Sequence, residues 1–180
     1  MNRLKEIRIA KGYTLQDVSE ATGYTKSFIS HLERGLKNPS IDSLRKIASF
    51  LNVPVFSLLE EEGENEPTAA CQIITPEAQQ KICLSSNSPV VYQIFTPNNG
   101  KSGLTGFLCH IGPGESSSGQ FVCHHYAECT YVMSGEMTAL IGEERHIVSA
   151  GSSIYVEPEV PHNFLNETDH ILTLFGVYYA

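Results

Sequence analysis

The acidic segment EEEGENEPT, at residues 60–68, separates two stretches whose hydrophobic patterns require different secondary structure. Before it, apolar residues recur at helical spacing; after it, short apolar runs alternate with Gly, Asn and Asp turns. The segment itself has no apolar side chain with which to form a core, and it is typical of an exposed linker. We therefore predict two domains of different class, an all-α domain at 1–59 and an all-β domain at 70–180, joined by an acidic linker at 60–69.

The net charge also differs between the two halves. Residues 1–59 carry nine Lys and Arg against five Asp and Glu, a net charge of +4. Residues 60–180 carry three against fifteen, a net charge of −12. This asymmetry indicates that the basic half binds a polyanion and that the acidic half has a different function.

Other features exclude some classes of protein. No apolar run approaches the roughly 18 residues that span a bilayer, so no membrane partner is expected. The N-terminus begins an amphipathic pattern at once, without the apolar centre of a signal peptide. The five cysteines are odd in number and form no CxxC pair, which favours buried, reduced thiols. We expect a cytoplasmic protein.

The all-α domain divides into five short helical segments with clear start signals. Thr14, Thr25 and Ser40 precede LQDVSEA, KSFISHLE and IDSLRKIASFL, and each can cap the helix that follows. The fifth segment is expected at about 54–59, with proline in its first turn. A helix, a tight glycine turn and a second capped helix are the arrangement of a helix-turn-helix.

Packing of the second and third segments sorts their residues into two groups. Their contact is expected from four apolar side chains, Val18, Ala21, Ile29 and Leu32. The outer face of the third segment then presents polar and basic side chains, Lys26, Ser27, Ser30 and His31.

The run TLQDVSEATGYTKSFISHLERGLKNPSIDSLRKIASFLNV resembles the phage-repressor (Xre-type) helix-turn-helix family, and the resemblance covers about residues 3 to 59. Its most specific part is the stretch ISxLERGxxNPS. The resemblance implies sequence-specific, dimeric binding to double-stranded operator DNA. By position, it implies base reading by Lys26, Ser27 and His31, and phosphate contact near Thr25.

Three further positions of the resemblance concern the scaffold and the phosphate contact. Arg8 and Glu33 fall where the family has a structural ion pair between the first and third helices. Leu15 occupies a position at which many members have a phosphate-contacting glutamine, and the neighbouring Gln16 is the candidate to replace it.

From residue 72 onward, short apolar segments recur about every ten residues with turn residues between them, which favours an antiparallel sandwich or barrel. One of these stretches, VCHHYAECTYVMSG, holds potential metal ligands. If a strand ends at His124 and another begins at Glu128 after a three-residue turn, the two side chains face each other. His125 has the opposite parity or lies in the turn, so it is the weaker ligand candidate.

Two stretches of the acidic half, GQFVCHHYAECTYVMSG and GSSIYVEPEVPHNFLN, resemble the two signatures of the cupin barrels over about residues 100 to 178. The resemblance implies a double-stranded β-helix of the jelly-roll type, which commonly holds one divalent metal on three His and one carboxylate. Val122 occupies the slot of the first His, and Gln120 has the parity to fill the gap. The predicted metal ligands are His124, Glu128 and His162.

These three groups leave the nature of the site open. Two His and one carboxylate suit the Fe(II) of non-haem oxygenases, and the same groups with water suit tetrahedral Zn²⁺. The alternative is a metal-free barrel in which the three groups hydrogen-bond to one another. His110, His146 and His170 have no partner at ligand spacing and are interpreted as ordinary histidines.

The leading hypothesis is a transcription regulator, not an enzyme, whose barrel binds a small-molecule effector and which acts as a homodimer. The alternative is an enzyme, because a helix-turn-helix followed by a cupin with this triad also resembles the iron-dependent phosphonate epoxidases. The net charge of +4 on the helical half favours the regulator, since phosphate neutralisation supplies much of the affinity for DNA.

Overall fold

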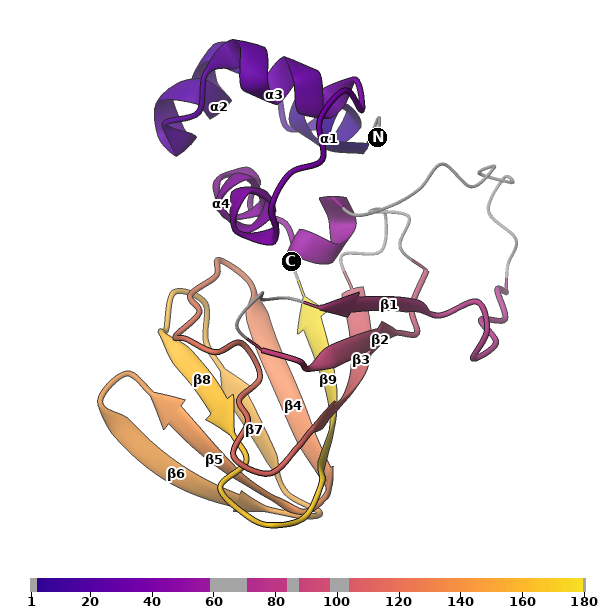
Figure 1. Cartoon of the computed structure of the whole chain (residues 1–180), viewed down its shortest axis with the longest axis vertical. Helices are drawn as coiled ribbons and strands as arrows, with labels where there is room; N and C mark the ends of the chain where they lie inside the picture. The colour runs from indigo at the N-terminus through magenta and orange to yellow at the C-terminus, as the bar shows by residue number, and fades with distance from the viewer. Residues whose placement is uncertain (1–2, 59–70, 84–87, 98–103, 180) are drawn as a thin grey trace. The chain divides into compact units, whose positions relative to one another are not determined.

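The computed structural model describes residues 3–58, 71–83, 88–97 and 104–179, and the predicted linker at 60–69 lies outside them. The chain forms two compact units, one of residues 1–72 with 98–102 and one of residues 73–97 with 103–180. Among the described residues, the first unit is helical and the second is built from strands (Figure 1). No helix in the described part of the chain is long and apolar enough to cross a membrane.

The described part of the helical unit contains four α-helices and one 3-10 helix. The prediction of five α-helices was wrong at the last segment, because Asn52 ends the fourth helix with φ of 51° and only four residues then form the 3-10 turn. A hydrogen bond from the Ser57 N–H to the Pro54 carbonyl, 2.9 Å long, closes this turn at three-residue spacing. The elements are α1 (Arg3–Ala10), α2 (Leu15–Thr22), α3 (Lys26–Glu33), α4 (Ile41–Leu51) and η1 (Val55–Leu58).

The helix boundaries follow the predicted caps. The Thr14, Thr25 and Ser40 side chains each accept a hydrogen bond from the backbone N–H three residues later, so each satisfies an otherwise unpaired donor. Gly23 ends α2 with φ of 71°, a left-handed conformation that other residues resist. The turn between α2 and α3 is therefore set by local chemistry.

The contact between α2 and α3 is smaller than predicted. Val18, Ile29 and Leu32 are buried, but Ala21 is exposed, so the prediction for Ala21 was wrong. Arg8 and Glu33 form the expected ion pair, with Nε–Oε1 and Nη2–Oε2 distances of 2.6 and 3.0 Å. This buried, bidentate ion pair connects α1 to α3 and thereby fixes the orientation of α3 in the helical unit.

The described strands of the second unit form two antiparallel sheets. The six-stranded sheet has the order β1-β2-β3-β9-β4-β7, and the three-stranded sheet has the order β6-β5-β8. Their bounds are β1 (Gln80–Cys83), β2 (Val91–Ile94), β3 (Leu104–Ile111), β4 (Ala127–Ser134), β5 (Glu136–Ile141), β6 (Glu144–Ser149), β7 (Ser153–Val156), β8 (His162–Leu165) and β9 (Leu172–Tyr179).

Alternation along the strands produces the core of this unit. On β9, Leu172, Leu174 and Tyr178 are buried while Phe175 and Tyr179 on the opposite side are exposed. All five cysteines are free, but Cys109 alone among them is buried, so the expectation of buried thiols was wrong for most of them.

Candidate metal centre and DNA-reading helix

Three potential metal ligands from different elements converge in the strand unit. Glu128 is the second residue of β4, His162 begins β8 in the other sheet, and His124 precedes β4. The Glu128 Oε2 lies 3.3 Å from the His124 Nε2 and 3.2 Å from the His162 Nε2. His124 is 9% exposed, Glu128 is 3% exposed and His162 is 1% exposed, so the cluster is shielded from bulk water.

The chain brings His124 to this cluster by a route that differs from the predicted hairpin. Val122 forms an isolated bridge with His162, with two N···O distances of 2.9 Å, while β4 pairs with β7 and β9. The prediction of a hairpin was therefore wrong, although the His124 and Glu128 side chains do contact each other. The backbone N–H of Glu159 donates to the His124 carbonyl at 2.8 Å, which fixes the segment from its other side.

The bridge also shows where Val122 lies. Directly opposed residues of an antiparallel pair project to the same side. Val122 is therefore on the same side of the strand pair as the His162 imidazole.

Backbone carbonyls orient both imidazoles. The Nδ1 atoms of His124 and His162 lie 2.7 and 2.8 Å from the carbonyl oxygens of Tyr126 and Val160. Since a carbonyl can only accept, each Nδ1 donates, and this turns the Nε2 atom of each ring toward Glu128. A neutral ring presents a lone pair there, whereas a protonated ring donates a hydrogen bond to the carboxylate. Thr130 donates to the other Glu128 oxygen at 2.8 Å.

This donor set fits a divalent cation. Two nitrogen lone pairs and a carboxylate oxygen, all within 4.8 Å of one another, repel unless a proton or a metal ion lies between them. Carbonyls behind the imidazoles and a hydroxyl behind the carboxylate are the partners that orient metal ligands in proteins.

The cluster shifts the pKa values of the groups around it. Burial favours a neutral Glu128, but hydrogen bonds from His124 and His162 outweigh it and hold the pKa of the carboxyl well below its usual range. Burial opposes charging of His162, yet its hydrogen bond with Glu128 raises its pKa. Burial, followed by the Glu128 charge, raises the pKa values of Cys109 and Tyr178. The neighbourhood therefore favours a cation at the cluster.

Aromatic rings form one wall of the cluster. The His124 ring stacks on Tyr126 with centroids 4.0 Å apart, and Tyr178 lies edge-on to both at 5.7 and 5.1 Å. Tyr126, Thr130 and Tyr178 were not predicted from the sequence. Alternation from Glu128 could have indicated Thr130, but Tyr178 is opposite Glu128 only through the register of β4 with β9.

The weaker ligand candidates lie outside the cluster. Gln120 and His125 are exposed, and His125 contacts the Glu159 carboxylate. The three histidines interpreted as ordinary are also exposed. His110 contacts Thr173, His146 contacts Glu144, and His170 contacts Asp169.

The predicted DNA-reading residues lie on α2, on α3 and at the cap of α3. Lys26 and Ser27 are exposed in the first turn of α3, and Ser30 and His31 are half-buried further along it. The Thr25 hydroxyl is occupied as the cap, accepting from the Phe28 N–H at 3.1 Å. Exposed Gln16 on α2 contacts Glu20.

Comparison with known families agrees with both halves of the structure. Residues 4–58 match the helix-turn-helix family, and residues 107–178 match the cupin domain family. The helical part of the chain belongs to the helix-turn-helix family, and the strand-rich part belongs to the cupin domain family.

The helix-turn-helix domain is 45% identical over 65 residues to the HTH-type transcriptional regulator SinR of Bacillus subtilis, a match covering 36% of this chain and 59% of SinR. The chain thus spans less than two thirds of that relative. The HTH-type transcriptional regulator PuuR of Escherichia coli is 28% identical over 177 residues, which cover 98% of this chain and 92% of PuuR.

Two solved structures resemble this chain over nearly its whole length. An HTH_3 family transcriptional regulator from Vibrio cholerae aligns with a TM-score of 0.64 at 23% identity, covering 99% of this chain and 93% of that one. The hydroxypropylphosphonic acid epoxidase from S. wedmorenis aligns with a TM-score of 0.53 at 20% identity, covering 98% and 94%. At these identities the likeness shows the fold.

Proposed function

We propose that the chain is a cytoplasmic, DNA-binding transcription regulator whose jelly-roll cupin barrel senses a small molecule and which acts as a homodimer. The observation that carries this proposal is the outer side of α3, where Lys26 and Ser27 are exposed on a helix held in place by the buried Arg8–Glu33 pair. The regulator names of SinR and PuuR support it, as does the net charge of +4 on residues 1–59.

In this proposal the residues at the start of α2 and along α3 contact the phosphates and the base edges of the DNA. The first turn of α3, capped by Thr25, offers its backbone N–H groups to a phosphate. Lys26 and His31 can donate to guanine acceptors in the major groove, and Ser27 and Ser30 can hydrogen-bond to either base type. Gln16, at the start of α2, supplies a further phosphate contact.

DNA binding is tested by fluorescence anisotropy with a labelled fragment of the gene's own promoter. We expect affinity to fall steeply as salt rises, because bound Lys and Arg displace counterions from the phosphates. Lys26→Ala should weaken binding about tenfold, whereas Lys81→Ala, on exposed β1, should not change it. Binding that is absent, or that does not depend on salt, contradicts the proposal.

We further propose that His124, Glu128 and His162 hold a divalent cation, Zn²⁺ or Fe²⁺, in the barrel. A bound cation would supply a Lewis-acid contact for an anionic or amine group of an effector. Elemental analysis of the purified protein tests the site, and Glu128→Gln should lower the metal content while leaving the helical unit folded. Metal content that does not change in this variant excludes the triad.

An effector in the barrel regulates only if it binds two arrangements of the dimer with different affinity. His162→Ala should therefore leave DNA affinity nearly unchanged and remove the response to the effector. Mass spectrometry of molecules that copurify with the protein identifies effector candidates.

A second candidate function is an iron-dependent oxygenase. It is favoured by the two-His, one-carboxylate cluster and by the fold likeness to the epoxidase. Oxygen consumption by the Fe²⁺-loaded protein with a panel of hydroxyphosphonates, abolished in Glu128→Gln, would establish this function in place of the sensor.

A further inference from the structure

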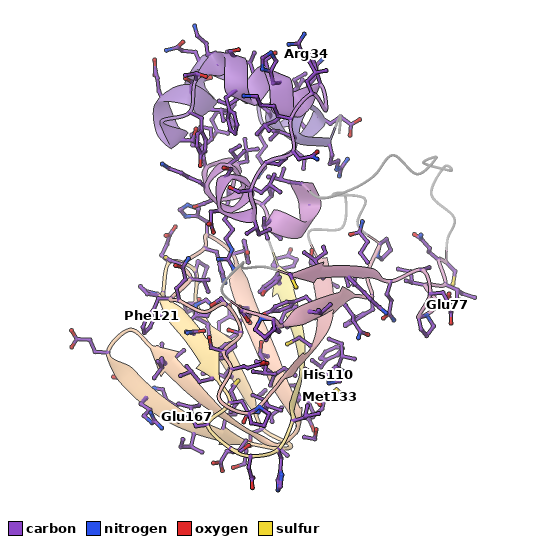
Figure 2. All side chains as sticks on the ribbon, in the orientation of Figure 1. Arg34, Glu77, His110, Phe121, Met133 and Glu167 are labelled. Atoms are coloured by element: carbon purple, nitrogen blue, oxygen red, sulfur yellow. The ribbon has the colours of Figure 1, made fainter. Side chains whose placement is uncertain are left out.

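The outer side of the six-stranded sheet carries a continuous apolar surface that spans four strands. Side chains on β3, β4, β7 and β9 that point away from the barrel interior include six large apolar or aromatic residues, each exposed by 39% to 68%. We define the outer sheet face by these residues, Leu104, Tyr131, Met133, Tyr155, Phe175 and Tyr179. Figure 2 labels Met133 and His110, which project from this same side.

Strand register makes this surface one patch. Phe175 on β9 lies directly between Tyr131 on β4 and Leu108 on β3. One step along on the same face, Tyr155 on β7 opposes Cys129, and two steps along, Tyr179 opposes Leu104. The Phe95 ring stacks on Phe175 with centroids 5.1 Å apart, which extends the patch toward β2. An exposed patch of this continuity marks a contact surface.

Charge indicates which partner fits the face. The outward residues of these four described strands include no Asp, Glu, Lys or Arg, although residues 60–180 carry a net charge of −12. Two acidic copies of one chain repel through most of their surfaces and can meet closely only where carboxylates are missing. A two-fold interface brings the same patch of both copies together, so a face without charge is self-complementary.

The exposed apolar area approaches that of a standard dimer interface. With roughly 200 Å² for a fully accessible large side chain, the six residues expose roughly 600 Å². A specific interface of standard size buries about 800 Å² on each partner. The half-buried Leu108, Cys129 and Val177 between them supply further apolar area.

We propose that a second copy of this chain packs its outer sheet face against this one, so that the two cupin domains form the two-fold contact of the homodimer. This deepens the proposed function by giving the homodimer a surface, and it places no demand on DNA binding. Sheets packed face to face lie about 10 Å apart, close enough for the Tyr131 and Phe175 rings of the two copies to interdigitate.

The test measures oligomeric state without DNA, so that its outcome is separate from that of the regulator hypothesis. Sedimentation equilibrium of the full chain should show a dimer, and Tyr131→Glu should weaken it about 100-fold or more because two like charges meet across the two-fold axis. Ile147→Glu changes an apolar side chain on β6 of the other sheet, which is 54% exposed against 43% for Tyr131. This variant should dimerise as the original chain does.

Circular dichroism confirms that each variant is folded. If Tyr131→Glu does not fold, Tyr155→Glu on the short edge strand β7 replaces it, since that side chain is 59% exposed and supports little of the core. A monomeric original chain at about 100 µM, far above the dissociation constants of stable dimers, overturns the proposal. So does a dimer that survives glutamate on the face but is lost in Ile147→Glu.

Discussion

Removal of the Glu33 carboxylate should destabilise the helical unit far more than removal of any surface charge. Glu33 and Arg8 are both nearly buried, and the two hydrogen bonds of 2.6 and 3.0 Å use both carboxylate oxygens. Glu33→Ala leaves the guanidinium buried with its Tyr13 carbonyl contact but without a counter-charge. Breaking a buried pair from one side costs about 3–5 kcal/mol.

The assay is urea unfolding followed by circular dichroism at the helix wavelength, because all described helices belong to the helical unit. For a small domain that loses about 1–2 kcal/mol per molar urea, the expected cost moves the midpoint by about 1.5 M or more. Removing both charges with Arg8→Met and Glu33→Leu together should restore most of the stability, since a buried ion pair and an apolar pair of similar volume are of comparable stability.

The matched control is Glu6→Ala, which removes the exposed Arg3–Glu6 pair of the same unit, 3.1 Å long. An exposed pair three residues apart on a helix contributes about 0.2–0.5 kcal/mol. If Glu33→Ala costs no more than Glu6→Ala, the Arg8–Glu33 pair does not hold α1 against α3, and the reasoning about the orientation of α3 is refuted.

Two further predictions concern the metal cluster. The pKa of His162 is raised in the folded protein, so the stability that it contributes is complete below the ordinary pKa of 6.5 and is lost as pH rises through the folded-state pKa. The pKa of Glu128 is lowered, so the stability that it contributes is present above the ordinary pKa of 4.5 and is lost as pH falls toward the folded-state pKa. Melting of the chelator-treated protein should therefore move to lower temperature as pH rises above 6.5, and the stabilisation by added Zn²⁺ should grow in the same direction because the ligands bind deprotonated. A flat profile that His162→Gln does not alter would count against both statements. Val122→His places an imidazole on the side that faces His162 and should tighten Zn²⁺ binding about tenfold or more in a chelator competition, and an unchanged affinity would mean that this side chain does not reach the centre.

Interactions between residues close together in the sequence made much of the secondary structure predictable. The caps at Thr14, Thr25 and Ser40 and the glycine at position 23 act within a few residues, so the helix starts and the helix-turn-helix could be predicted without tertiary information. The cupin signatures likewise place His124, Glu128 and His162 in one group, because their spacing is a property of the chain.

Other features arise from pairings between distant segments, which no local pattern encodes. The sequence suggested a hairpin at His124 and Glu128, but Val122 pairs with β8, about 40 residues further along, because β4 is already flanked by β7 and β9. Tyr178 reaches the cluster through the same register, and the outer sheet face exists only where β3 and β9 lie side by side. The sequence by itself determined which domains, caps and ligand types are present; the tertiary structure decided how the ligands are approached and which side chains share a surface, because strand register is set by the packing of the whole sheet.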